Sequence, residues 1–385
     1  MTRTTPPCPD AAQLREWRHD FHRHPEIAFE EQRTSERIVT LLREADIEVH
    51  TGLAGTGVVA TVEGRRGPGQ AIGLRADIDA LPIQEVNDFD HASLVPGRMH
   101  ACGHDGHTTM LLGAARALAR DPDFAGRIHF IFQPAEENEG GAQVMIEAGL
   151  FERFPMTAVY GLHNWPGMPV GEAAVLDGPV MAAFDVFTLT LSGRGCHAAM
   201  PHAGSDTVLA ACELVTRLQG IVSRESPAHQ PAVLSITQFH GGDAFNVMPE
   251  RVELRGTVRC FDPTLRAYLQ RRLGEAIEST AGFHGLTADL DYQVRYPATY
   301  NDPEHATRCA EVLEAMPDIH RVHRDLPPCM ASEDFSFMLA QCPGAYIWMG
   351  NGDSAALHNP AYDFNDDLTP LGVAWWQALV KKLLA

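Results

Sequence analysis

The sequence predicts an α/β protein in which a mixed, mostly parallel sheet with its helices is interrupted by an inserted ferredoxin-like α+β domain. Three observations support this fold class. At 385 residues, the chain exceeds the size at which a single hydrophobic core stops growing. Strand, loop and helix patterns alternate through the first part of the chain and again after residue 296. Between these parts the order changes to β-α-β-β-α-β, as in a ferredoxin-like sandwich. The expected domains are 1–182, 183–295 and 296–385.

The first part begins with two helices. Apolar residues recur at helical spacing after Asp10, which is a suitable N-cap. The pair His24-Pro25 interrupts the pattern, because a residue before proline leaves the helical conformation. A second helix is expected at 31–45. Further strands are expected at 58–62, 71–76, 127–132 and 158–162, and further helices at 107–120 and 143–149.

The inserted part opens with residues 185–191, which alternate as a half-buried strand does. Three more strands are expected at 231–239, 251–260 and 286–294, with helices at 205–221 and 265–281. In the last part, Asp302 is expected to cap a helix. After this helix we expect a second helix at 332–339, a strand at 345–349 and a C-terminal helix from 369.

Composition excludes several classes of protein. The 50 acidic and 30 basic side chains give a formal net charge of −20, which disfavours nucleic acid or an anionic membrane as partner. No apolar run approaches the roughly 18 residues of a membrane-spanning helix. The first nine residues have no apolar core like that of a secretory signal, and we expect a disordered leader. The eight cysteines form no CxxC pair. We expect reduced thiols and a cytoplasmic protein.

Residues 99–107, Met-His-Ala-Cys-Gly-His-Asp-Gly-His, gather one thiol, three imidazoles and one carboxylate. Cys102 and His104 are two residues apart, so in an extended segment their side chains leave the same face. A thiolate beside an imidazole suits zinc or a neighbouring transition metal better than magnesium or calcium. The alternative is a histidine-rich loop that holds a buried cysteine. The cluster as a whole favours a metal site.

Other candidate ligands follow predicted strands or lie in a loop, as site residues tend to do. They are Glu136, Glu137, His163 and His358. In extended backbone the adjacent Glu136 and Glu137 point to opposite sides, so one can bind a metal while the other faces a metal-bound water. A Lewis acid with a general base is the minimum for hydrolysing an amide. A solvated acidic loop is the alternative for this segment.

The motifs together resemble the M20 metallopeptidase/amidohydrolase family, in the aminoacylase-like branch that includes hippurate hydrolases and auxin–amino acid conjugate hydrolases. The resemblance runs from about Trp17 to the C-terminus, through segments 22–26, 75–82, 102–107, 133–137, 161–163 and 332–335. It implies a centre of two divalent ions, zinc or manganese, with cobalt or nickel as further options. The implied ligands are Cys102, His104, Glu137, His163 and His358. Cys102 takes the position of the bridging aspartate of other members, and Glu136 resembles the catalytic base.

The resemblance also assigns roles beyond the metal ligands. It implies that the inserted domain is a lid and dimerisation domain, in a homodimer or homotetramer. His197 resembles the lid histidine that stabilises the tetrahedral oxyanion. Asn246 and Arg259 resemble contacts to the substrate carboxylate or oxyanion, with ordinary turn and strand-end residues as the alternative. Asp77 and Asp105 are expected to orient histidine ligands, or, for Asp105, to cap the helix before His107.

The expected substrate is a small N-acyl-amino acid, such as hippurate or an N-acetyl-amino acid. Its hydrolysis would give a carboxylic acid and a free amino acid, with metal-activated water and Glu136 as general base. A dipeptidase or carboxypeptidase on the same scaffold is the nearest alternative. A non-catalytic metal-binding protein has no use for Glu136 beside Glu137. An oxidoreductase is disfavoured because no strand precedes a GxGxxG turn.

Overall fold

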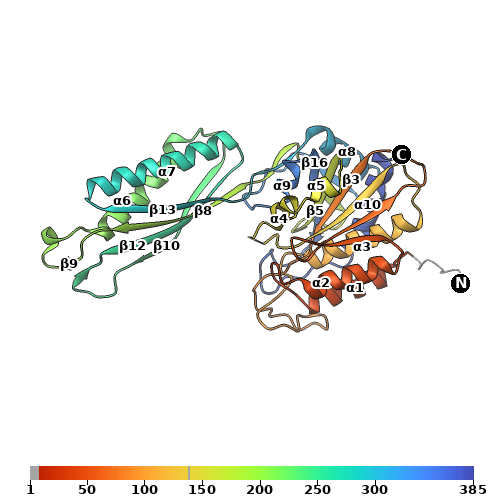
Figure 1. Cartoon of the computed structure of the whole chain (residues 1–385), viewed down its shortest axis with the longest axis horizontal. Coiled ribbons are helices and arrows are strands. Elements are labelled where there is room, and N and C mark those ends of the chain that lie inside the picture. The colour runs from red at the N-terminus through yellow and green to blue at the C-terminus, as the bar shows by residue number, and fades with distance from the viewer. Residues whose placement is uncertain (1–7, 138) are drawn as a thin grey trace. The chain divides into compact units, whose positions relative to one another are not determined.

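The computed structural model describes residues 8–137 and 139–385 (Figure 1), so most of the predicted leader lies outside the described residues. The chain divides into two compact units. The first comprises the described residues up to Val180, together with Tyr300–Pro327 and Asp334–Ala385. The second comprises Met181–Thr299 and Pro328–Glu333. No helix among the described residues combines the length and apolar character needed to cross a membrane.

The first unit is built on an eight-stranded sheet with the order β1-β2-β4-β3-β5-β16-β6-β15. The strands are β1 (Glu48–Leu53), β2 (Gly57–Glu63), β3 (Ala71–Asp77), β4 (Arg127–Gln133), β5 (Ala158–Pro166), β6 (Glu172–Ala174), β15 (Arg321–His323) and β16 (Gly344–Gly352). The four central strands β4, β3, β5 and β16 run parallel, whereas β1 and β2 pair antiparallel on one side. On the other side, β6 pairs antiparallel with β16 and parallel with β15. The predicted mixed, mostly parallel sheet is therefore confirmed.

Helices pack on this sheet, and all but α5, which was not predicted, lie close to the predicted positions. They are α1 (Ala11–Arg23), α2 (Gln32–Arg43), α3 (His104–Arg120), α4 (Gly141–Glu147), α5 (Leu150–Arg153), α8 (Pro303–Glu314), α9 (Ser336–Leu339) and α10 (Leu368–Leu383). The Asp10 carboxylate caps α1 by accepting the Gln13 N–H at 2.9 Å, as predicted. All residues of α3 from His104 to Leu118 are buried, because α3 packs against β3 and against α1 and α10.

Two helices, α3 and α9, start three or more residues from the predicted position, each for a physical reason. α3 begins at His104, three residues early, because Gly103 turns the chain with a left-handed φ of 99°. Asp105 therefore lies inside the first turn, and the prediction that it caps the helix is wrong. α9 is limited to Ser336–Leu339, because the Asp334 side chain is engaged by β3, β4 and α4 in hydrogen bonds described below.

The second unit is the predicted ferredoxin-like sandwich. Its antiparallel sheet has the order β10-β12-β8-β13, and along the chain the elements follow as β8-α6-β10-β12-α7-β13. They are β8 (Ala183–Ser192), α6 (Thr207–Gly220), β10 (Ala232–Gly241), β12 (Arg251–Cys260), α7 (Pro263–Phe283) and β13 (Thr287–Val294). α6 and α7 lie side by side on one face of the sheet (Figure 1), over a core of alternate strand residues such as Phe187, Leu189 and Leu254.

The remaining elements are short. β9 (Cys196–His197) pairs with β11 (Val247–Met248), and β7 (Gly178–Met181) pairs with β14 (Thr299–Asn301). A 3₁₀ turn, η1, covers Pro201–Ala203, and a π turn, η2, covers Ile221–Glu225. None of these was predicted, because two to five residues are too few to show a hydrophobic period.

Candidate metal centre and active site

The candidate site lies at the carboxyl ends of the central parallel strands. β3 pairs with β4 so that Asp77 is opposite Gln133, and with β5 so that Arg75 is opposite Gly161. The segments at the ends of these strands therefore meet at one edge of the sheet. They carry Asp79, Glu136, Glu137 and His163.

The predicted ligands form two groups that share one residue. Side-chain ligand atoms of Cys102, His104 and His163 lie within 4.8 Å of one another. The same limit holds for those of Cys102, Glu137 and His358. Cys102 Sγ is 3.3 Å from His163 Nε2, and His358 Nε2 is 3.2 Å from Glu137 Oε1. Because Cys102 belongs to both groups, its thiol lies where a ligand could bridge two ions.

The donor atoms fit a pair of divalent transition-metal ions. The Nε2 atom of His104 is buried and has no hydrogen-bond partner among the described residues. Leaving a buried polar atom unsatisfied costs about 1–3 kcal/mol, a cost that a bound cation would remove. Thiolate, imidazole and carboxylate together are the donor set of zinc and its neighbours rather than of calcium or magnesium.

Hydrogen bonds orient two of the imidazoles toward the cluster. His104 Nδ1 donates to the Asp79 carbonyl oxygen at 2.9 Å, and the Asp79 carboxylate is 3.3 Å from the same nitrogen. His163 Nδ1 donates to the carbonyl oxygen of Asn164 at 2.7 Å. In both rings Nε2 is left to face the other candidate ligands, as in known metal sites where the second ring nitrogen is held by a carbonyl or carboxylate.

Asp77 and Asp105 form no hydrogen bond with a predicted ligand in the part of the chain that the structure describes, although Asp77 Oδ2 lies 3.8 Å from His104 Nε2. Asp77 Oδ1 is 2.6 Å from Nδ1 of His107, which is not a predicted ligand. Asp105 Oδ2 is 2.8 Å from Nδ1 of His22. The residue that holds His104 is Asp79, which the sequence showed only as a second carboxylate at a strand end. The segment that follows β3 places the Asp79 carbonyl oxygen beside His104, the first residue of α3.

The segment that carries Glu136 is held from both sides. The Glu137 N–H donates to Asp79 Oδ2 at 3.0 Å, and the Asp334 N–H donates to Glu136 Oε1 at 3.3 Å. Ala135 has a left-handed φ of 54°, and its N–H donates to Glu31 Oε1 at 3.0 Å. The sequence predicted no role for Glu31, a single acidic residue far from the cluster, and it showed Asp334 only as part of the family-like segment 332–335.

The electrostatic environment of the cluster favours a bound positive charge. Burial, with Glu137 and Glu136 nearby, raises the pKa of the Cys102 thiol well above its ordinary value. Burial alone would lower the pKa of His104. The nearby Asp77 and Asp79 have the larger, opposite effect and raise this pKa to about 10. The hydrogen bond with Glu137 raises the pKa of His358. A divalent cation would take the place of these protons, because thiol and imidazole ligands bind metals in their deprotonated forms.

The other predicted site residues belong to the second unit. His197 lies on β9 opposite Val247 of β11, and its Nδ1 accepts the Ala199 N–H at 3.1 Å. The carbonyl oxygen of the neighbouring Asn246 accepts the Ala198 N–H at 2.9 Å. His197 and Asn246 are thus brought together, and both are exposed.

Arg259 lies elsewhere in the second unit, on β12. Its guanidinium stacks over the Phe184 ring at 4.0 Å and donates to Ser332 Oγ at 2.8 Å. Burial lowers the pKa of Arg259, although an arginine remains charged at neutral pH. The contacts hold the guanidinium in one orientation with a cationic edge available for an anionic group.

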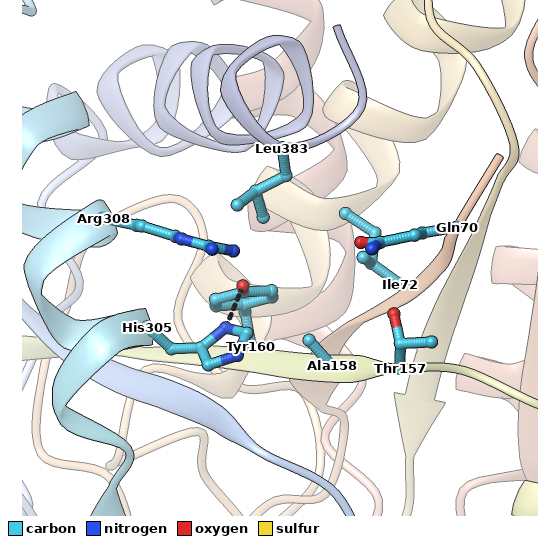
Figure 2. A pocket seen from close by; sticks show the side chains of 8 residues that line it. All are labelled: Gln70, Ile72, Thr157, Ala158, Tyr160, His305, Arg308 and Leu383. Carbon is cyan, nitrogen blue, oxygen red and sulfur yellow. Dashed lines mark hydrogen bonds between the residues drawn. The ribbon is translucent and has the colours of Figure 1, made fainter.

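A cavity of about 130 Å³ lies at the opposite, amino-terminal edge of the sheet, beside the first residues of β3 and β5 (Figure 2). It is lined by Gln70, Ile72, Thr157, Ala158, Tyr160, His305, Arg308 and Leu383. Tyr160 Oη is 2.6 Å from His305 Nδ1, and Arg308 forms an ion pair with Glu304. None of the predicted site residues lines this cavity.

Comparison with known proteins places these features in a family context. Residues 73–382 match the family described as peptidase family M20/M25/M40. N-acetylcysteine deacetylase of Bacillus subtilis is 37% identical over 352 residues, which cover 91% of both chains. Hippurate hydrolase of Campylobacter jejuni is 36% identical over 367 residues, with 95% of both chains covered. Thermostable carboxypeptidase 2 of Saccharolobus solfataricus is 34% identical over 390 residues, which cover 98% of this chain and 96% of that relative.

A solved structure is similar along nearly the whole chain. It is a dinuclear metal-binding peptidase of the M20 family from Bacillus subtilis, with a TM-score of 0.85 and 33% identity. The match covers 97% of this chain and 98% of that one. The two candidate ligand groups that share Cys102 agree with a centre of two metal ions.

Proposed function

The chain belongs to peptidase family M20/M25/M40, and from this premise we propose that it hydrolyses N-acyl-amino acids to a carboxylic acid and a free amino acid. The named activities of its relatives support an amidohydrolase, since they include an N-acetylcysteine deacetylase and a hippurate hydrolase. The observation that carries the proposal is the position of Glu136. Its carboxylate lies within 4.8 Å of ligand atoms of His104 and Glu137, so a carboxylate that is not among the predicted ligands stands beside the ligand cluster.

We assign Cys102, His104, Glu137, His163 and His358 as the residues that would hold the two ions, with Cys102 a member of both ligand groups. Zinc or manganese is the proposed occupant, and cobalt or nickel would be accepted by the same donors. Bound ions would polarise the amide carbonyl and lower the pKa of the attacking water. Asp79 keeps the His104 ring in the orientation that presents Nε2, and the Asn164 carbonyl does the same for His163.

Glu136 is the proposed general base. Its carboxylate takes the proton of the attacking water and passes it to the nitrogen of the leaving amino acid. Only 7% of Glu136 is exposed, so few water molecules compete for its oxygens. The hydrogen bond from the Asp334 N–H holds Oε1 in place.

The second unit is proposed to complete the site when it closes as a lid. His197 would donate a hydrogen bond to the oxyanion that develops on the carbonyl oxygen. Arg259 and Asn246 would contact the substrate carboxylate, and the oriented Arg259 guanidinium suits a bidentate contact of this kind. A homodimer or homotetramer and a cytoplasmic location remain predictions from the family resemblance and from the reduced cysteines.

A carboxypeptidase is the second candidate function. Thermostable carboxypeptidase 2 supports it, because it matches this chain over almost its full length. Both reactions cleave an amide next to an α-amino acid carboxylate, so the same five ligands and the same base would serve either. The difference lies in the acyl side, where a carboxypeptidase accepts a peptide.

A substrate panel decides between them. The purified protein is stripped with a chelator, reloaded with zinc, manganese, cobalt or nickel in turn, and assayed with N-acetyl- and N-benzoyl-amino acids and with dipeptides and longer peptides. We expect the acyl-amino acids to give the higher kcat/KM. Glu136→Gln should retain both ions and lose several orders of magnitude in kcat. Preference for peptides would favour the carboxypeptidase, and substantial turnover by Glu136→Gln would remove Glu136 as the base.

A further inference from the structure

We propose that Arg75 is a positioning residue: one buried guanidinium holds the segment that carries Glu136 and, at the same time, the hydrogen-bond chain behind His163. The inference deepens the proposed function and rests on it for the role of Glu136. It starts from the burial of Arg75, which is 1% exposed on the central strand β3. An arginine cannot lose its charge at such a position, so its donors must all find acceptors.

Each nitrogen of the guanidinium has an acceptor on a different segment. Nε donates to Gln133 Oε1 at 2.7 Å, Nη1 to Asp77 Oδ2 at 2.7 Å and Nη2 to Asp334 Oδ1 at 3.0 Å. The acceptors stand at the end of β4, at the end of β3 and just before α9. A planar fork with fixed directions therefore sets the relative positions of three chain segments.

The first branch leads to the base. Asp334 Oδ2 accepts the Ala142 N–H at 2.9 Å, and Gln133 Nε2 donates to both Asp334 oxygens at 2.9 Å. With both oxygens held, the backbone of Asp334 is fixed, and its N–H points to Glu136 Oε1 at 3.3 Å. Gln133 Nε2 also approaches the Pro134 carbonyl oxygen at 3.1 Å, at the start of the same segment.

The second branch leads toward a predicted ligand. Because Arg75 occupies Asp77 Oδ2, the other oxygen is directed to His107 Nδ1 at 2.6 Å. His107 Nε2 lies 2.7 Å from the Asn164 side-chain oxygen, and Asn164 follows His163 in β5. Arg75 touches none of the five predicted ligands in this chain of contacts, so its loss should disturb geometry before it removes a metal ion.

The test uses Arg75→Lys, which keeps the charge but replaces a planar fork by one flexible ammonium that cannot face three acceptors in fixed directions. Arg116→Lys is the matched control. Arg116 is also buried, donates to the Leu41 carbonyl oxygen at 3.0 Å and covers the Trp17 ring, all remote from the predicted ligands. Both metal-loaded variants are compared with the wild-type enzyme for kcat, KM, metal content, melting temperature and backbone hydrogen exchange.

We expect Arg75→Lys to lower kcat about a hundred-fold, the size of effect that a 1 Å misplacement produces, with KM within about threefold of wild type. It should retain two ions and show faster hydrogen exchange at the backbone amides of Asp334 and Ala142, because the Arg75 guanidinium holds the Asp334 side chain in place. Arg116→Lys should lower the melting temperature without either change. If Arg75→Lys does not fold, Asp334→Asn, which keeps the shape but not the charge, is measured in its place.

Equal kcat values for Arg75→Lys and Arg116→Lys, an effect on KM alone, or unchanged exchange at residues 334 and 142 would overturn the inference. Failure of the proposed function has a different signature, namely a wild-type enzyme that cleaves no N-acyl-amino acid. In that case hydrogen exchange, which needs no substrate, still decides whether Arg75 positions the segment.

Discussion

The Glu31 carboxylate accepts the backbone N–H of Ala135 at 3.0 Å, across 104 positions of sequence. Glu31 just precedes α2, whereas Ala135 is the left-handed residue immediately before Glu136. Glu31 also accepts the Thr56 hydroxyl at 2.7 Å and the Phe29 N–H at 3.0 Å, and it is fully buried. A single acidic side chain from the N-terminal region thus holds the unusual backbone conformation of the segment that carries the proposed base.

Glu31 should make stability depend on pH in a defined window. Burial raises its pKa from 4.5 to about 7, and the hydrogen bond from Thr56 offsets part of that rise. The folded state therefore binds a proton that the unfolded state releases between these values. The contribution to stability is fully present below pH 4.5 and is lost as pH rises to about 7, by at most about 3 kcal/mol.

Glu31→Gln removes this titration but keeps an acceptor for the Ala135 N–H. The free energy of unfolding in urea is measured for both proteins at pH 5 and at pH 7.5. At each pH the difference between variant and wild type cancels the titration of other groups. We expect the variant to gain stability relative to wild type as pH rises. A difference that is the same at both pH values would contradict the raised pKa.

Cys102→Ala should lower the metal content of the purified protein below two ions per chain. The reason is that the thiol belongs to both candidate ligand groups, so both ions lose a donor. Cys309→Ala is the control, since Cys309 is a buried cysteine within α8, in the hydrophobic core. Elemental analysis after dialysis gives the stoichiometry. Two ions retained in Cys102→Ala would remove Cys102 from the proposed ligands.

His104→Leu and His100→Leu should have different effects on metal content, because His104 is a proposed ligand and His100 is not. Both side chains are buried, but His104 belongs to the first ligand group, whereas neither ring nitrogen of His100 has a hydrogen-bond partner among the described residues. Burial lowers the pKa of His100 to about 4, so a neutral residue can replace it without loss of charge at pH 7.

Metal content and melting temperature with and without a chelator are measured for each. We expect His104→Leu to lose metal and most of the stabilisation by metal, which amounts to about 4 kcal/mol at a thousand times Kd. His100→Leu should keep both. Loss of metal in both variants would mean that His100 also contributes to the centre.

Gly103→Ala should disturb the centre more than a comparable glycine change elsewhere. A Cβ at residue 103 would lie 2.2 Å from the Asn164 side-chain oxygen, in a backbone conformation with φ of 99°. Gly167→Ala is the control, because Gly167 has a φ of 84° and nothing within 4 Å of the added carbon. Both variants bear the strain of about 1–2 kcal/mol for a left-handed alanine.

Only Gly103→Ala should also displace Asn164, next to the ligand His163, and lower metal affinity. A metal titration of the stripped proteins, followed by fluorescence or calorimetry, measures that affinity. Equal affinities in the two variants would show that the close approach of Gly103 to Asn164 does not support the centre.

The fold could be predicted from local patterns to a large extent. The alternation in residues 185–191 and 251–260 and the two helical patterns at 205–221 and 265–281 were enough to predict the ferredoxin-like unit. A strand or helix of this length repeats its hydrophobic period several times. The short strands β6 and β15 were missed for the opposite reason. The start of α9 was predicted four residues too early, because distant donors and acceptors, not local propensity, hold Asp334 before the helix.

The sequence by itself determined the chemistry available to the site: a thiol, imidazoles and paired carboxylates, each near the end of a strand. Only the tertiary structure decided which of these groups lie close together and which residues hold them in place. For example, Asp79 rather than Asp77 forms the hydrogen bond with His104. The physical reason is strand order. β3 lies between β4 and β5, although both follow it in sequence, so the partners of Asp79, Glu136 and Arg75 come from segments that no local pattern connects.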